Sequence, residues 1–190
     1  MKKEVSPTII IDEAAKLFFA NGYKNTSLQE VAKTLNLTRP ALYHYFNSKE
    51  QILSSILEDV ITKTNQYLSE IMELDEPPHI KFEKMVRSHI LLVLNHQIKF
   101  GIFFEEQKSL PTHITQNPKQ VIDHYYGLAT EWFTDGIRNG HFIDINPRIA
   151  VQTILGSCNW AYKWYSPTGA LSKDEIAELM SNVLINGYKK

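Results

Sequence analysis

Apolar residues along this chain recur at spacings of three and four, which is the period of one face of an α-helix. Leu28, Val31, Ala32 and Leu35 are a short example, at i, i+3, i+4 and i+7. Longer stretches repeat this spacing through the rest of the chain, without the alternation typical of a half-buried β-strand. The pattern therefore predicts an all-α protein.

Start and stop signals divide this pattern into about nine helices. Gly22, the Pro-containing cluster 75–78 and the Asn-Gly pair 139–140 are typical of helix ends or boundaries, and Pro111 of a stop. The expected helix starts are Ser48 with Gln51 as a capping box, Asn117, Pro147 and Ser172. The expected helices cover residues 8–21, 28–35, a short stretch from 39, 49–74, 80–96, 99–108, 118–139, 147–165 and 172–187.

Residues 27–49 are typical of a helix-turn-helix. The break at 36–38 is long enough only for a tight turn, and Thr38 is a natural N-cap for a second helix that begins near Arg39. Pro40 falls in the first turn of that helix, where a missing N–H costs nothing. The exposed face of this helix is basic and hydroxylated, which suits DNA bases and phosphates: Arg39, Tyr43 and His44, with Tyr45 beside them.

The pattern T-S-x-x-x-V-A-x-x-L-x-L-T-x-x-A-L-Y-x-Y-F-x-S-K, over residues 26–49, resembles that of the TetR family of bacterial one-component repressors. The preceding F-x-x-N-G-Y is similar to the family as well. This resemblance covers the first quarter of the chain and implies an N-terminal three-helix helix-turn-helix DNA-binding domain, residues 1–48. It further implies a C-terminal helical ligand-binding and dimerisation domain, residues 49–190, and double-stranded operator DNA as partner.

By this resemblance, Arg39 is the expected base reader, because a guanidinium binds guanine O6 and N7 together for roughly 1–3 kcal/mol of discrimination. An exposed helix arginine without a function is the alternative. Tyr43 and His44 are expected at bases or phosphates, with surface packing as the alternative, and Tyr45 at phosphates. The rest of the expected DNA-binding set in this helix is Thr38, Pro40 and Ala41, the last being small enough to touch a thymine methyl group.

Three further residues are expected at the DNA phosphates. Thr26 and Ser27 stand where the first helix of the motif begins, so a phosphate can accept from their hydroxyls and from free helix N–H groups. Plain N-capping is the alternative role and is compatible with the first. Lys49 resembles the family's phosphate anchor, and a solvated lysine is the ordinary alternative.

Charge is distributed unevenly along the chain. Residues 1–49 contain seven Lys or Arg and four Asp or Glu, a net +3, so the remainder carries −4 of the total −1. A basic head on an acidic body directs DNA to the head.

Composition predicts a cytoplasmic protein. The chain is 190 residues long and 43% apolar, which is enough to bury roughly 70% of its unfolded surface. The single Cys158 excludes an intramolecular disulfide framework, and we expect it to be an inert helix residue rather than a redox sensor. A leading apolar signal segment and an apolar run of membrane-spanning length are both missing, so no membrane is expected as a partner.

A homodimer is expected, because operator-reading helix-turn-helix proteins use two recognition helices about 34–36 Å apart. The predicted helices 147–165 and 172–186 have more apolar residues than a small monomer core needs, so an intersubunit four-helix bundle is the expected interface, although plain monomer core is the alternative. The residues concerned are Ile149, Val151, Ile154, Leu155, Trp160, Ile176, Leu179, Met180, Val183 and Leu184.

The body of the chain is rich in aromatic residues, which typically line pockets for small apolar effectors. For each polar candidate a structural role is the alternative. The expected effector-binding residues are His89, Phe103, Phe104, Tyr125, Trp132, Asn159, Trp160, Lys163 and Trp164.

Residues 138–148, R-N-G-H-F-x-x-x-x-P-R, and 156–169, G-S-C-N-W-A-Y-K-W-Y-S-P-T-G, resemble a TetR subgroup that responds to acyl-CoA thioesters. This resemblance implies that Arg138, Arg148 or Lys163 meets the CoA phosphates. A plain lipophilic inducer is the alternative effector.

The helix that begins at Lys49 belongs to both domains. We therefore expect an effector that shifts this helix to release the protein from DNA; an arrangement in which the ligand is a corepressor is the alternative.

An enzyme is the second hypothesis. The sequence contains no G-x-S-x-G, Walker A, H-E-x-x-H or C-x-x-C motif, and its seven histidines show no tight ligand spacing. We therefore expect no enzymatic activity, no cofactor and no metal, although His113 and His124 near Glu105 and Glu106 can in principle hold one. A third possibility is a helical interaction module that does not bind DNA.

Overall fold

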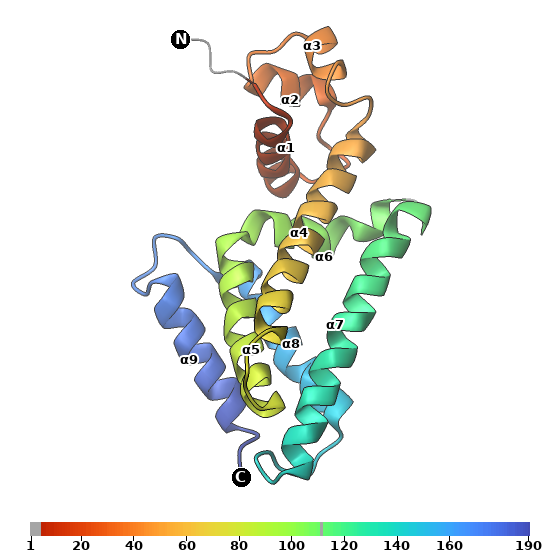
Figure 1. The fold of residues 1–190 in the computed structure, drawn as a ribbon. Helices are drawn as coiled ribbons and strands as arrows, with labels where there is room; N and C mark the ends of the chain where they lie inside the picture. The colour runs from red at the N-terminus through yellow and green to blue at the C-terminus, as the bar shows by residue number, and fades with distance from the viewer. Residues whose placement is uncertain (1–4, 111) are drawn as a thin grey trace. The chain divides into compact units, whose positions relative to one another are not determined.

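The computed structural model describes residues 5–110 and 112–190, with the side chains of 107 and 112–118 left aside. Within these ranges it has nine α-helices, one short 3-10 helix and no β-structure beyond an isolated bridge between Phe142 and Lys189 (Figure 1). The expected all-α fold and number of helices are confirmed. The chain forms two compact units: the first is Met1–Ile61 with Ile98–Pro118, and the second is Thr62–Gln97 with Lys119–Lys190.

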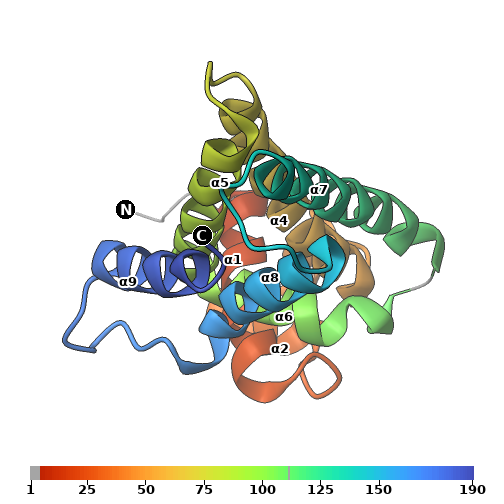
Figure 2. The same ribbon diagram turned by 90° about the horizontal axis from the view of Figure 1, so that it is seen from below.

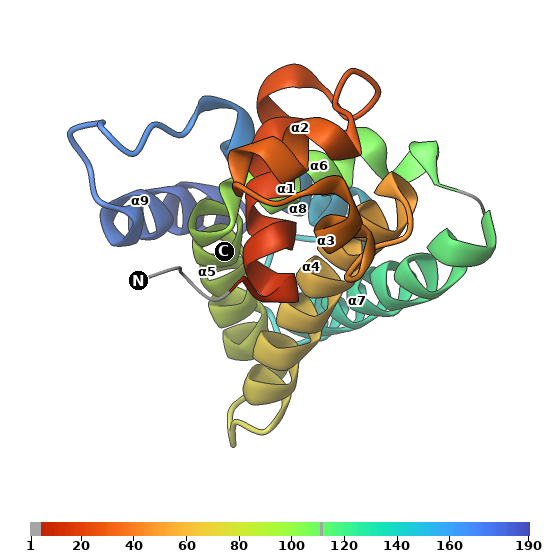
Figure 3. The same ribbon diagram turned by 90° about the horizontal axis from the view of Figure 1, so that it is seen from above.

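Three short helices begin the first unit: α1 (Pro7–Asn21), α2 (Leu28–Thr34) and α3 (Arg39–Tyr43), seen from above in Figure 3. Each has a hydroxyl side chain at its N-cap, from Ser6, Ser27 and Thr38 in turn. Gly22 ends α1 at a φ of 85°, a left-handed conformation that glycine adopts without strain.

Helix α4 (Lys49–Met72) follows and contributes residues to both units. Its start was predicted correctly, since the backbone N–H of Gln51 donates to Ser48 Oγ at 3.2 Å. The Gln51 side chain accepts from the Asn47 N–H at 2.8 Å, so it does not close the predicted capping box on Ser48. The first unit also contains α6 (Gln97–Glu106) from its second residue onward, the 3-10 helix η1 (Gln107–Ser109) and the start of α7 (Thr112–Arg138).

The second unit is built around α5 (Pro78–Asn95), which packs against α8 (Pro147–Trp164) and α9 (Lys173–Asn186), as seen from below in Figure 2. The core beside α5 includes the stacked rings of Phe133 and Phe142, 4.7 Å apart. A Cβ on Gly136 would lie 2.3 Å from the Phe142 ring, so only glycine permits this approach.

One predicted boundary is wrong. Helix α7 spans Thr112–Arg138, so it begins before the expected start at 118 and residue 117 is not its N-cap. A proline presets the helical φ and is therefore enriched at helix starts, but the same φ is tolerated further inside at the cost of one hydrogen bond. The pair Asn117-Pro118 therefore does not mark the start of α7. Pro111, predicted as a stop, lies outside the described residues.

Candidate DNA-binding site

Helices α2 and α3 pack as the helix-turn-helix pattern predicts. Val31 and Ala32 of α2 are buried, as are Leu42 of α3 and Phe46 just after it. Asn36 makes the turn with a φ of 54°, in the left-handed region that asparagine tolerates better than most residues. The burial of these four apolar residues leaves the opposite face of α3 exposed.

Arg39 and Tyr43 form a pair on this exposed face. Arg39 Nη2 donates to the Tyr43 hydroxyl at 3.3 Å, and its guanidinium lies 5.3 Å from the ring centroid. Both residues are exposed, as are Thr38, Pro40, His44 and Tyr45. The pair presents a planar cation and a hydroxyl group together, a combination that suits base edges and phosphates.

Ser27 and Glu30 form a capping box at the start of α2. Ser27 Oγ accepts from the Glu30 N–H at 3.3 Å, and the Ser27 N–H donates to Glu30 Oε2 at 2.7 Å. Hydrogen bonds from the backbone N–H of Ser27 and then from its hydroxyl hold the pKa of Glu30 below its ordinary value. The capping role of Ser27 is therefore confirmed, and its hydroxyl donates to Glu30 Oε2 at 2.7 Å. Contact of Ser27 with a phosphate stays a prediction.

Thr26 is placed differently from the expectation for a phosphate ligand. Its side chain is buried, and its hydroxyl donates to the carbonyl oxygen of Gly22 at 3.0 Å. The single hydroxyl proton is therefore already used within the protein. In this arrangement Thr26 stabilises the connection between α1 and α2.

Lys49 is also engaged by its own chain. Its Nζ lies 2.6 Å from the carbonyl oxygen of Tyr23 and 2.9 Å from that of Thr26. Its ammonium group is therefore not simply solvated, and a phosphate contact by Lys49 stays a prediction. Its cation closes the loop between α1 and α2 and so fixes the start of α2.

A pocket of about 400 Å³ brings half of the predicted DNA-binding set together. Residues of the α1–α2 loop, the start of α2, α3 and the start of α4 line it. The predicted members are Thr26, Ser27, Arg39, Tyr43 and Lys49, and sequence reasoning did not assign Lys24, Asn25, Leu28 and Gln29 to the site. We call this the α2–α3 pocket. Lys24 is a cation two residues before the motif that begins at Thr26, and this position was the signal that could have identified Lys24.

The other five predicted DNA-binding residues do not line this pocket. Thr38 caps α3 by accepting from the Ala41 N–H at 3.3 Å, and Pro40 occupies the first turn as predicted. The Tyr45 hydroxyl donates to the Val5 carbonyl at 3.1 Å, and the Tyr45 ring lies edge-on to His44.

In the second unit, three of the predicted effector-binding residues lie together. His89, Tyr125 and Asn159 form one polar cluster with Tyr67 and Tyr126, which sequence reasoning did not assign. The polar cluster draws on α4, α5, α7 and α8, and no spacing along the sequence could have indicated it. His89 and Tyr125 are only 5% and 4% exposed.

The remaining effector candidates are dispersed. Phe103 and Phe104 lie in α6 of the first unit, where their rings contact each other edge-on. Trp132 is buried, but Trp160 and Trp164 are 57% and 49% exposed, so they do not line an enclosed pocket in this chain. Lys163 lies 5.4 Å from the ring centroid of Tyr162.

A pocket of about 720 Å³ opens between α7 and α8 of the second unit. We call it the α7–α8 pocket. It is lined by Tyr126 of the polar cluster and by two residues of opposite charge, Asp123 and Arg148. Of the three cations that the sequence associated with CoA phosphates, Arg148 is therefore the one at this pocket, whereas Arg138 and Lys163 do not line it. Its size is that of a typical small-molecule site.

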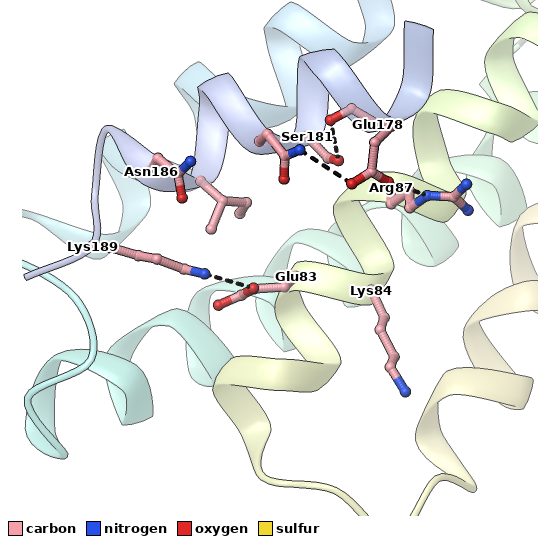
Figure 4. Close-up of a pocket in the computed structure, with 9 residues that line it drawn as sticks. Glu83, Lys84, Arg87, Glu178, Ser181, Asn186 and Lys189 are labelled. Atoms are coloured by element: carbon pink, nitrogen blue, oxygen red, sulfur yellow. Dashed lines mark hydrogen bonds and ion pairs between the residues drawn. The ribbon is translucent and has the colours of Figure 1, made fainter. Parts of the chain in front are cut away.

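A narrower groove lies between α5 and α9 (Figure 4). Arg87 bonds to Glu178 at 3.2 Å and to Asp174 at 3.3 Å, and Lys189 bonds to Glu83 at 3.0 Å. These charges neutralise one another across the groove. The groove is therefore a structural contact between the two helices.

Chemistry at Cys158 and at the histidines is limited. Burial raises the pKa of Cys158 to about 12, so it stays a thiol. Within the described part of the chain, no group of three or more His, Cys, Asp or Glu residues is arranged to hold a metal ion. The side chain of His113 lies outside that part. No described helix is both long and apolar enough to cross a membrane.

Two family models match this chain. Residues 10–56 match the model for bacterial regulatory proteins of the tetR family, and residues 75–188 match the tetracyclin repressor-like C-terminal domain. Together they cover the α2–α3 pocket and almost the whole second unit.

Individual relatives agree. The HTH-type transcriptional repressor KstR2 of Rhodococcus jostii is 23% identical over 186 residues, which are 95% of this chain and 89% of that protein. The crystal structure of AibR in complex with isovaleryl coenzyme A and operator DNA matches with 27% identity and a TM-score of 0.83, covering 94% of this chain and 97% of that one. The structure of KstR2 of Mycobacterium tuberculosis, 17% identical, shares the fold with a TM-score of 0.93 over 99% of this chain and 97% of that one.

Proposed function

This chain belongs to the TetR family of transcriptional regulators, which are not enzymes, and we propose that it is a ligand-responsive repressor. In this proposal it binds a palindromic operator as a homodimer, with residues 1–48 as the DNA-binding domain and 49–190 as the effector and dimer domain. A small lipophilic or acyl-CoA-like effector releases it from DNA.

The observation that supports DNA binding most directly is the exposed pair of Arg39 and Tyr43 at the α2–α3 pocket. The pocket also contains Lys24, whose ammonium group can donate to a phosphate, whereas the Ser27 hydroxyl already donates to Glu30 Oε2 at 2.7 Å. We assign base reading to Arg39 and contacts with the DNA phosphates to Tyr43 and Lys24. Lys49 and Thr26 act by holding the loop that presents Ser27.

The dimer proposal rests on an apolar face that this chain leaves uncovered. Ile149 and Trp160 of α8 are 58% and 57% exposed, and Leu179 and Val183 of α9 are 54% and 74% exposed. Large apolar side chains left this exposed are typical of interaction sites. Four residues that the sequence analysis placed in the interface are instead buried in the second unit, which corrects that part of the prediction: Val151, Ile154, Leu155 and Ile176.

The effector proposal rests on the α7–α8 pocket and on the relatives. AibR was crystallised with an acyl-CoA and operator DNA together, and it is similar to this chain over almost its whole length. The pocket has the size of a small-molecule site, and Arg148 provides a cation for a phosphate. We therefore place the effector in this pocket.

Selection of binding sites from random duplex DNA tests the proposal. The purified protein should enrich an inverted repeat whose half-sites lie one helical turn apart, and its affinity should fall steeply between 50 and 200 mM salt. Adding octanoyl-CoA should release the DNA. Enrichment of no sequence would favour the helical interaction module, and tighter binding with the thioester would favour a corepressor.

A further inference from the structure

The polar cluster of the second unit has its hydrogen bonds oriented in one direction. The Tyr67 hydroxyl donates to that of Tyr125 at 2.5 Å. The Tyr125 hydroxyl in turn lies 3.1 Å from His89 Nδ1 and donates its own proton to that nitrogen. Tyr67 also lies 3.2 Å from Nδ1, but its single proton is already given to Tyr125.

The tautomer of His89 follows from these bonds. Burial lowers its pKa to about 4, so the ring is neutral and carries one proton. Because Nδ1 accepts, that proton is on Nε2 and is donated to Asn159 Oδ1 at 2.6 Å. Asn159 then directs its Nδ2 at the Tyr126 hydroxyl, 3.5 Å away.

Tyr126 stands at the end of this series and lines the α7–α8 pocket. Its oxygen accepts from Asn159, so its own proton is left to donate. Among the described residues it has no acceptor for that proton. Burial raises the pKa of Tyr126, so the proton stays on the hydroxyl at neutral pH. The pocket therefore offers a ligand one half-buried hydrogen-bond donor.

The charges of the pocket select among acceptors. Arg148 attracts an anion, but Asp123 lies three residues from Tyr126 on the same helix and lines the same pocket. A carboxylate next to Tyr126 would therefore meet a like charge. A neutral carbonyl oxygen meets no such penalty, and a distant phosphate of the same ligand can still reach Arg148.

We propose that Tyr126 recognises the thioester carbonyl of an acyl-CoA effector and distinguishes it from the free carboxylic acid. This inference rests on the proposed function, which places an acyl-CoA-like effector in this pocket. Contact at Tyr126 polarises the hydrogen bonds through Asn159, His89 and Tyr125 to Tyr67. Tyr67 belongs to α4, the helix whose first residues, Lys49–Ile61, lie in the first unit.

The test uses two CoA probes that differ only at this position, octanoyl-CoA and the thioether S-octyl-CoA, which lacks the carbonyl oxygen, and as a third probe the free acid octanoate, which lacks the CoA group as well. Isothermal titration should show that the natural protein binds the thioester about tenfold more tightly than the thioether, the ratio expected for one hydrogen bond. It should bind octanoate far more weakly. Tyr126→Phe should bind the thioester and the thioether equally, and Tyr188→Phe, which removes a hydroxyl elsewhere in the second unit, should behave as the natural protein.

Several results would overturn the inference. One is a Tyr126→Phe variant that keeps the tenfold preference, and another is a natural protein that binds the thioester and the thioether equally. If the natural protein binds neither CoA compound yet still binds its selected DNA, the pocket assignment falls while DNA-binding function stands. Nitrogen-15 NMR of His89 provides a test without ligand: a proton on Nδ1 instead of Nε2 would reverse the hydrogen bonds and remove the donor from Tyr126.

Discussion

Lys49 Nζ lies 2.6 Å from the carbonyl oxygen of Tyr23 and 4.3 Å from the centroid of the Tyr23 ring. The cation thus fastens the start of α4 to the loop that follows α1. Hydrogen bonds to a charged group contribute about 1.5–3 kcal/mol each when both partners are shielded, and Lys49 is half-buried. We infer that this lysine acts on DNA binding through the shape of the loop.

Replacing Lys49 with Met keeps the alkyl stem and removes the ammonium group. We expect Lys49→Met to lower the free energy of unfolding by about 1–3 kcal/mol and to weaken binding to all DNA sequences alike. Urea unfolding and fluorescence anisotropy over a salt series measure both effects. A salt slope smaller by about one would show instead that Lys49 contacts a phosphate directly.

Arg39 should determine sequence preference at one base pair. Arg39→Ala removes the bidentate donor, so we expect discrimination at that position to fall by roughly 1–3 kcal/mol while binding to unrelated DNA changes little. Competition with operators substituted at each position measures this. Lys33→Ala, which removes an exposed cation from α2, is the control and should leave the preference intact. An unchanged preference in Arg39→Ala would remove Arg39 as the base reader.

The helix-turn-helix was predictable because its signals are local. The spacing of Val31, Ala32 and Leu42 and the cap at Thr38 depend on residues only a few positions apart. The bonds from Lys49 to Tyr23 and from Tyr67 to Tyr125 join residues far apart in sequence, and nothing in either segment names its partner. The family resemblance supplied a role for Lys49 but not its contacts, and these changed the interpretation.

Lys99 of α6 should be important for the stability of the first unit. Its Nζ lies 2.7 Å from both Asp12 of α1 and Asp59 of α4. Burial opposes its charge, but the hydrogen bonds to the two carboxylates outweigh it and raise the pKa of Lys99. We expect Lys99→Met to lower the free energy of unfolding by about 1–3 kcal/mol, because two carboxylates then lose their partner.

The matched control for Lys99 is an ion pair at the surface. Lys16 bonds to Glu13 at 2.6 Å, but its side chain is 57% exposed. Lys16→Met should therefore cost less than about 1 kcal/mol. Equal effects of the two substitutions in urea unfolding would contradict the role assigned to Lys99.

Acid should destabilise the protein through His89. Its folded pKa of about 4 lies below the unfolded value of 6.5, so the unfolded state binds more protons between these two pH values. Stability is complete above pH 6.5 and is lost as the pH falls toward 4, by about 2 kcal/mol between pH 7 and pH 5. Urea unfolding at both values measures the loss. His89→Gln should reduce this dependence by that amount; the same dependence in both proteins would mean that His89 is not the neutral, buried group described.

Gly156 should reveal the dimer interface. It lies in the middle of α8 on the exposed side, four residues before Trp160, and a Cβ there would have nothing within 4 Å in this chain. A glycine inside a helix costs about 1 kcal/mol relative to alanine, so its presence is consistent with a partner helix that approaches closely. Gly156→Leu should therefore stabilise the isolated subunit yet shift the protein to monomers in analytical ultracentrifugation. Gly127 of α7 is equally open, and Gly127→Leu should remain dimeric. A dimer unaffected by Gly156→Leu would place the interface elsewhere, because a leucine side chain cannot fit between closely packed helices.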